Sequence, residues 1–177
     1  MKTQKMVLSA FFLALALALP FLTGQLPQIG NMLSPMHFPV LLCGFICGWP
    51  YGLAVGFIAP LLRFMLFGMP PIFPTGIAMA FELAVYGAVS GFVFGKVKHS
   101  IPMVYAALIS AMLAGRVVWG AVRFILARLF GMNFSFSMFL SGAFITALPG
   151  IIFQLILIPL IVAAIERANL LPQKTAR

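Results

Sequence analysis

The amino-acid sequence predicts an all-α membrane protein, a compact bundle of six transmembrane helices built by a single domain that covers residues 1–177. Hydrophobic residues form 63% of the chain and charged residues 7%, whereas a soluble domain is about 45–50% apolar and about 25% charged. The mean hydropathy is +1.16. Because a spanning helix needs roughly 20 apolar residues, the chain has room for about five to seven spans and short loops, and not for a water-facing domain.

Six apolar runs account for the spans. Span one stops near Pro20, and Pro50 begins span three at a position where its missing N–H costs nothing. Prolines in residues 68–74 predict a rigid extended loop before span four. Span two is short for a full crossing, and span five is long enough to tilt. We expect the spans at residues 5–21, 36–49, 50–68, 74–97, 101–130 and 138–167.

The net charge of +9 comes from eleven Lys and Arg against two acids. In a soluble protein this balance would suggest nucleic acid, but here the basic residues lie at the ends of apolar runs, which excludes a nucleic-acid surface and favours a cytoplasmic location for these ends. Both termini are therefore expected inside. A signal peptide over residues 1–20 is disfavoured, because the bundle needs this helix. The basic residues are Lys2, Lys5, Lys96, Lys98, Arg167, Lys174 and Arg177.

Four charged residues lie within the predicted spans: Arg63, Glu82, Arg116 and Arg123. Each costs about 2.5–3.5 kcal/mol at the bilayer centre, so each needs a partner, a cavity or a function. At about 1.5 Å per residue, Arg63, Glu82 and Arg123 lie roughly 8, 12 and 10 Å below the outer ends of their spans. Arg116 lies two turns below Arg123 on the same helical face. We expect the four to line one cavity.

Glu82 is expected to pair with one of the arginines as a structural ion pair. One glutamate cannot neutralise three arginines, so two positive charges are left over. Water, backbone carbonyls or snorkelling would satisfy them, and so would an anionic ligand group such as a carboxylate, with bidentate geometry. The positive surplus therefore predicts an anionic substrate.

Three further residues are candidates for the same substrate site. His37 opens span two on the outer side, Asn133 lies in the outer loop before span six, and Trp119 lies between the two deep arginines. A lone histidine is more often interfacial than a ligand, and Trp119 equally fits lipid or core packing. Cys43 and Cys47, one turn apart without a His or Cys cluster, predict two small buried residues. We expect no metal and no cofactor.

Span one carries Ala10, Ala14 and Ala18 at a strict spacing of four residues. This places a stripe of small side chains on one helical face, where a second helix can approach closely. The stripe fits packing within the bundle and docking of a partner about equally well.

Taken together, these features resemble the substrate-binding S components of energy-coupling factor (ECF) vitamin transporters. The resemblance rests on the six spans, the alanine stripe, a long first outer loop, and the segment MHFPVLLCGFICG at 36–48 followed by Gly52, Gly56 and Pro60. It implies capture of a vitamin near the outer face of the bacterial plasma membrane, under the loops after spans one, three and five. It also implies docking of the alanine stripe on a membrane scaffold subunit, toppling of the loaded protein in the membrane, and ATP hydrolysis by two separate ATPase subunits.

The resemblance does not identify the vitamin. The arginines favour a carboxylate, with pantothenate first, ahead of folate, niacin or biotin and of neutral or cationic pyrimidine or pyridine vitamins. A cobalt or nickel substrate is disfavoured because the family members that bind these metals carry an N-terminal His, and this chain begins MKTQ.

Three rival functions for so apolar a chain are a self-contained small transporter or channel, a structural subunit, and a membrane enzyme, for which the chain offers few acid–base groups.

Overall fold

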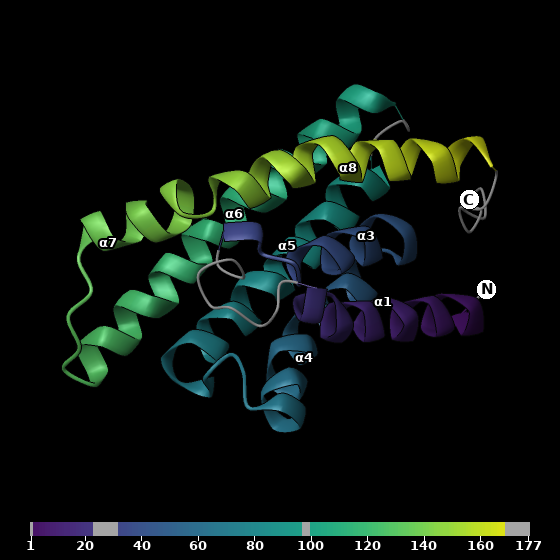
Figure 1. Cartoon of the computed structure of the whole chain (residues 1–177). Helices are drawn as coiled ribbons and strands as arrows, with labels where there is room; N and C mark the ends of the chain where they lie inside the picture. Colours follow the sequence, from purple (N-terminus) through teal and green to yellow (C-terminus); the bar gives the residue numbers. More distant parts are fainter. Residues whose placement is uncertain (1, 23–31, 97–99, 169–177) are drawn as a thin grey trace.

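The computed structural model describes residues 2–22, 32–96 and 100–168, and every regular element within these ranges is helical (Figure 1). Five helical stretches are long and apolar enough to cross a membrane, and a shorter apolar helix follows the first. This agrees with the predicted all-α bundle. The elements are α1 Lys2–Leu22, α3 His37–Cys47, α4 Trp49–Phe67, the π-turn η1 Ile72–Gly76, α5 Ile77–Lys96, α6 Ile101–Leu129, α7 Phe136–Leu140, the π-turn η2 Ser141–Ile145 and α8 Leu148–Arg167.

The observed helices follow the expected spans closely, and prolines mark the departures. α1 continues through Pro20 and ends at Leu22, one residue beyond the expected end of span one. The stretch Phe136–Arg167 is long and apolar enough to be span six, but within it α7 and η2 precede α8, which has Pro149 in its first turn. The loop before span four is extended at Pro71 but then turns, with the N–H of Gly76 donating to the Pro71 carbonyl at 2.9 Å.

The backbones of α3, α4 and α5 approach one another closely because glycines lie where the helices cross. A Cβ at Gly52 of α4 would stand 2.5 Å from the Gly87 carbonyl oxygen of α5, and a Cβ at Gly56 would collide with the Leu83 carbonyl. A Cβ at Gly44 of α3 would also stand 2.5 Å from the Gly87 carbonyl oxygen. These contacts leave no room for any side chain, so the three helices form the tightly packed part of the molecule.

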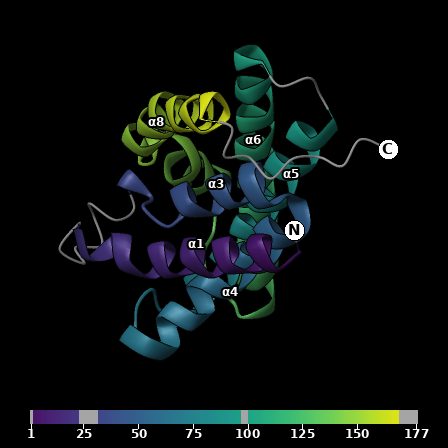
Figure 2. The same ribbon diagram turned by 90° about the vertical axis from the view of Figure 1, so that its right-hand side faces the viewer.

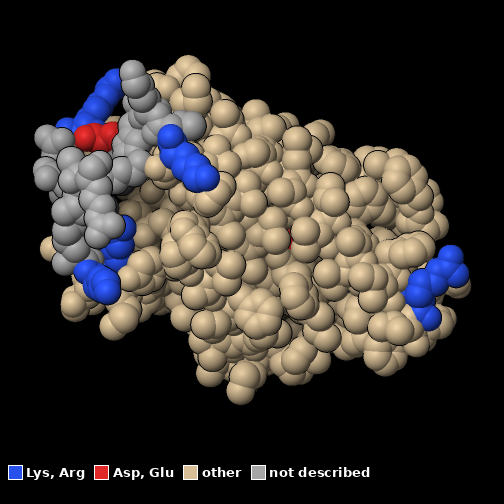
Figure 3. Space-filling model, turned by 180° about the vertical axis from the view of Figure 1, so that it is seen from behind, with Lys and Arg blue, Asp and Glu red and all other residues tan. Residues whose placement is uncertain are grey.

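α1 and α8 flank α3 on opposite sides, as Figures 1 and 2 both show. Each buries one face only: α1 turns Phe12 and Ala16 toward the core, and α8 turns Ile158 and Val162. The N-terminal end of α1 and the C-terminal end of α8 lie on the same side of the molecule. In the space-filling view of Figure 3, lysines and arginines gather at two opposite ends, with a wide uncharged band between them. This band matches the surface that a lipid bilayer requires.

Candidate functional site

A buried charge cluster joins α3, α5 and α6. Glu82 of α5 is 1% exposed, and its Oε1 lies 3.0 Å from a terminal guanidinium nitrogen of Arg116 and 3.3 Å from Nε2 of His37. The contact with Arg116 is an ion pair, and neither contact meets the angles of a hydrogen bond. The predicted pairing of Glu82 with one arginine is confirmed, and Arg116 is that arginine.

Tyr86 lies one turn after Glu82 on α5 and completes the cluster. Its ring packs edge-on against the His37 imidazole, with the ring centroids 5.0 Å apart at 90°. The ring also fills the space left by Gly115 of α6, where a Cβ would stand 2.5 Å from two ring carbons. Among the residues that the structure describes, the Tyr86 hydroxyl and the Nε of Arg116 have no hydrogen-bond partner, and both are buried.

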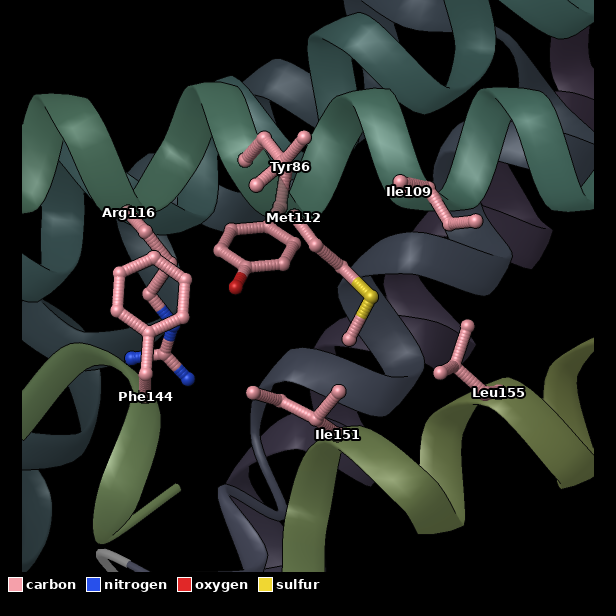
Figure 4. Close-up of a pocket in the computed structure, with 8 residues that line it drawn as sticks. Tyr86, Ile109, Met112, Arg116, Phe144, Ile151 and Leu155 are labelled. Atoms are coloured by element: carbon pink, nitrogen blue, oxygen red, sulfur yellow. The ribbon is translucent and has the colours of Figure 1, made fainter. Parts of the chain in front are cut away.

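A cavity of about 170 Å³ opens beside this cluster, between α5, α6 and the segment η2–α8 (Figure 4). Tyr86 and Arg116 are the polar residues among those that line it. The rest of the wall is apolar and comes from Ile109, Met112, Leu113, Phe144, Ile151 and Leu155. The arrangement can hold a small molecule that has one polar end and an apolar body.

Arg63 does not line this cavity, contrary to the prediction of a single charged layer. It is 3% exposed, and its guanidinium donates a hydrogen bond to the Leu17 carbonyl of α1. The same group lies over the rings of Phe21 and Phe67, 4.8 and 5.3 Å from their centroids. Depth along a helix does not determine the direction of a side chain, and Arg63 faces α1 and not α5.

Arg123 and Trp119 also lie away from the cavity wall, near the far end of α6. The Arg123 guanidinium lies over Trp119 and Phe134, 5.8 and 5.3 Å from the two ring centroids. Trp119 stacks on Phe139 of α7, at 6.2 Å and 28°. α7 thus covers this part of α6 with aromatic rings. Asn133 is exposed in the loop before α7 and does not contribute to the cavity.

Sequence reasoning missed most of the cavity wall. Tyr86 had a usable signal, because four residues after Glu82 places it on the same face of α5. The apolar residues carry no such signal, since leucine, isoleucine and methionine are abundant throughout the chain.

Cys43 and Cys47 are buried free thiols, as expected. Residues 23–31, which form most of the long first outer loop, lie outside the described residues. So do His99 and the basic residues Lys98, Lys174 and Arg177.

The alanine stripe of α1 faces outward. Ala10, Ala14 and Ala18 are exposed, whereas Phe12 and Ala16 on the other face are buried. Large apolar neighbours extend the exposed face, with Val7 65% and Phe11 56% exposed. No described part of the bundle packs on this stripe, so it is available to lipid or to another protein.

A family model for the substrate-specific component of ECF transporters matches residues 4–162. No curated protein and no solved structure matches the sequence. The family match covers far more than half of the chain, and it agrees with the helical architecture. The chain therefore belongs to the family of ECF transporter substrate-specific components.

Proposed function

We propose that this chain captures a small anionic vitamin, with pantothenate as the first candidate, in the cavity beside Arg116 and delivers it to an ECF scaffold subunit. Family membership supports a membrane-embedded binding subunit that associates with scaffold and ATPase subunits and is not itself the ATPase. Beyond family membership, we propose the cavity as the binding site, an anionic vitamin as the ligand, the exposed face of α1 as the docking surface and the bacterial plasma membrane as the location.

The observation that carries this proposal is a pair of buried polar groups beside the cavity, neither of which has a hydrogen-bond partner in the described structure. They are the Tyr86 hydroxyl and the Nε of Arg116. A buried donor that stays unsatisfied costs about 1–3 kcal/mol. A ligand that brings acceptor atoms to this end of the cavity would satisfy both groups, and its apolar part would lie against Met112 and Leu155.

The predicted excess of positive charge, which counted three arginines against Glu82, does not act at the cavity, because Arg63 and Arg123 lie elsewhere. What favours a carboxylate is the shape of Arg116: Glu82 contacts one terminal nitrogen, whereas the guanidinium carries five donors in a planar fork. A carboxylate can accept two hydrogen bonds from the remaining edge.

The size of the cavity narrows the choice of vitamin. Its volume of about 170 Å³ is close to that of an engineered protein cavity of about 150 Å³ that binds benzene. A single-ring vitamin such as niacin suits this space best and folate worst, whereas pantothenate and biotin are similar in size and are not separated by volume.

Binding by the purified chain in detergent tests the proposal. We expect pantothenate to bind and panthenol, in which an alcohol replaces the carboxylate, to bind at least tenfold more weakly. Tyr86→Phe removes a single hydroxyl and should weaken binding about fivefold, the equivalent of one hydrogen bond. Tyr105→Phe is the matched control, because Tyr105 is 38% exposed and lies outside the cavity. Equal binding by the two variants would remove the cavity assignment.

A neutral pyridine or pyrimidine vitamin is the second candidate. It is favoured by the pairing of Glu82 with Arg116, which leaves no net positive charge in the cluster when His37 is neutral. Nicotinamide and nicotinate separate the two candidates, because they differ only in the carboxylate. Preference for nicotinamide would replace the anionic assignment. Uptake by the purified chain alone in liposomes would favour the self-contained transporter instead.

The exposed stripe of α1 supports the docking proposal. We expect both termini in the cytoplasm, because basic residues lie at the α1 and α8 ends. Ala14→Trp should abolish co-purification with the scaffold subunit and leave vitamin binding intact, since a large side chain prevents close helix approach. Ala106→Trp on α6 is the control, because this alanine is also exposed but lies on another helix. Unchanged co-purification of the Ala14 variant would remove the docking face.

A further inference from the structure

Within the part of the chain that the structure describes, Arg63 is a buried arginine without an acidic partner, and it lies at the joint between α1 and α4. The chain has only two acids. Glu82 contacts Arg116 and His37, and Glu166 lies in the last turn of α8. Arg63 instead donates to a backbone carbonyl of α1, that of Leu17.

Two aromatic rings, one from each helix, lie next to the guanidinium. Phe21 comes from α1 and Phe67 from α4, and their rings pack edge-to-face with centroids 4.9 Å apart. Arg63 lies over both rings. A guanidinium stacks on aromatic faces while it hydrogen-bonds in its own plane, so this contact fixes the direction of α1 as well as its distance from α4.

α1 is lightly packed on the described bundle, and Arg63 is one of the contacts that hold its C-terminal half. Only 22% of its most apolar window is buried in the bundle, compared with 56% for the stretch Ile72–Lys96. Pro20 lies in the turn that Arg63 contacts, and it has no N–H to donate to the helix. The guanidinium therefore braces α1 where its own hydrogen bonding is weakened.

α4, on the other side of the joint, is packed rigidly on α5 through Gly52 and Gly56. We propose that Arg63 is a positioning residue, which holds α1 at a fixed angle to the α4–α5 pair so that the exposed alanine face meets the scaffold subunit. It acts on docking and not on the vitamin. This inference rests on the proposed docking function of α1.

Arg63→Met tests the inference, because methionine is apolar and of similar length but cannot donate to a carbonyl. We expect vitamin binding within twofold of wild type, measured with pantothenate or nicotinamide, whichever the wild type binds. Affinity for the scaffold–ATPase complex in detergent should fall about tenfold, the equivalent of one hydrogen bond from a charged group. Arg63→Lys keeps a donor without the planar fork and should lose less.

A cross-link separates bracing from direct contact with the scaffold. In a chain with Cys43→Ala and Cys47→Ala, Phe21→Cys and Phe67→Cys can be joined by a short bifunctional thiol reagent. The joined chain that also carries Arg63→Met should regain docking, because the link replaces the brace. The inference is overturned if the cross-link does not restore docking to the Arg63→Met chain, or if that chain docks as well as wild type without the cross-link. Loss of vitamin binding by a folded Arg63→Met chain would overturn it as well.

The same experiment distinguishes this inference from the proposed function. If the wild-type chain does not bind the scaffold complex, the docking proposal fails, and with it the premise of the inference. If wild type docks and the Ala14→Trp chain does not, the docking face stands, and the Arg63→Met result alone decides the role of the brace. Should Arg63→Met not yield folded protein, Arg63→Lys with and without the cross-link provides the same comparison.

Discussion

Two helix crossings in this molecule are built in opposite ways. Where α4 meets α5, glycine backbone lies directly on backbone, and no side chain fits between Gly52 and Gly87. Where α6 faces η2 and α8, side chains hold the elements apart around a cavity of about 170 Å³. We call these the packed crossing and the open crossing. The difference indicates that the packed crossing supplies a fixed floor, which carries Glu82 and Tyr86, while the open crossing supplies the wall that a ligand meets.

The largest expected effect comes from the charge cluster between the two crossings. Glu82→Gln keeps the shape but leaves the Arg116 charge buried and uncompensated, which should destabilise the protein by about 3–5 kcal/mol. Unfolding in a detergent titration measures this. Glu166→Gln removes the other acid, in the last turn of α8, and should change stability by less than about 1 kcal/mol. Equal effects would mean that the cluster does not hold the crossings together.

An intermediate effect is expected at the packed crossing itself. Gly52→Ala puts a Cβ 2.5 Å from the Gly87 carbonyl oxygen, so α4 and α5 must separate, at a cost of about 2–3 kcal/mol. Gly95→Ala, on the exposed face of α5, meets no neighbouring atom and should stabilise the helix by about 0.5–1 kcal/mol. Thermal unfolding of the two variants should therefore shift in opposite directions. A shift in the same direction would contradict the rigid floor.

The smallest effect is expected at the open crossing. A Cβ at Gly142 would stand 3.0 Å from the end of the Trp119 indole ring, which is a side chain and not backbone. Because the ring can move, Gly142→Ala should cost less than about 1 kcal/mol. The thermal unfolding used for Gly52→Ala provides the comparison. If Gly142→Ala is as damaging as Gly52→Ala, the open crossing is as rigid as the packed one.

The helices were predictable from the sequence because apolar runs and prolines determine local structure. Span five was expected at residues 101–130, and α6 occupies Ile101–Leu129. The interruption before α8 was not foreseen, although Pro149 lies there, because a membrane helix often continues through proline when its neighbours satisfy the freed carbonyl. α1 does so at Pro20.

The candidate site was only partly predictable, for a geometric reason. Residue counting yields the depth of a charge in the membrane, but its lateral direction depends on how each helix is rotated and on which helices are neighbours. Glu82 and Arg116 come together because α5 and α6 pack side by side. Arg63 was expected at a similar depth, but it points to α1 on the far side of α4. Only tertiary packing separates these two outcomes.

The short helix α3 has a consequence for the route of a solute. Its 11 residues rise about 16 Å, roughly half of a hydrocarbon layer of about 30 Å. It begins at His37, directly beside Glu82, so the chain before it brings peptide groups down to the level of the charge cluster. Ser34 and Met36 of that stretch are buried in protein and shielded from lipid. We therefore expect a polar solute that approaches along this stretch to meet protein groups, and not lipid, on its way to the cluster.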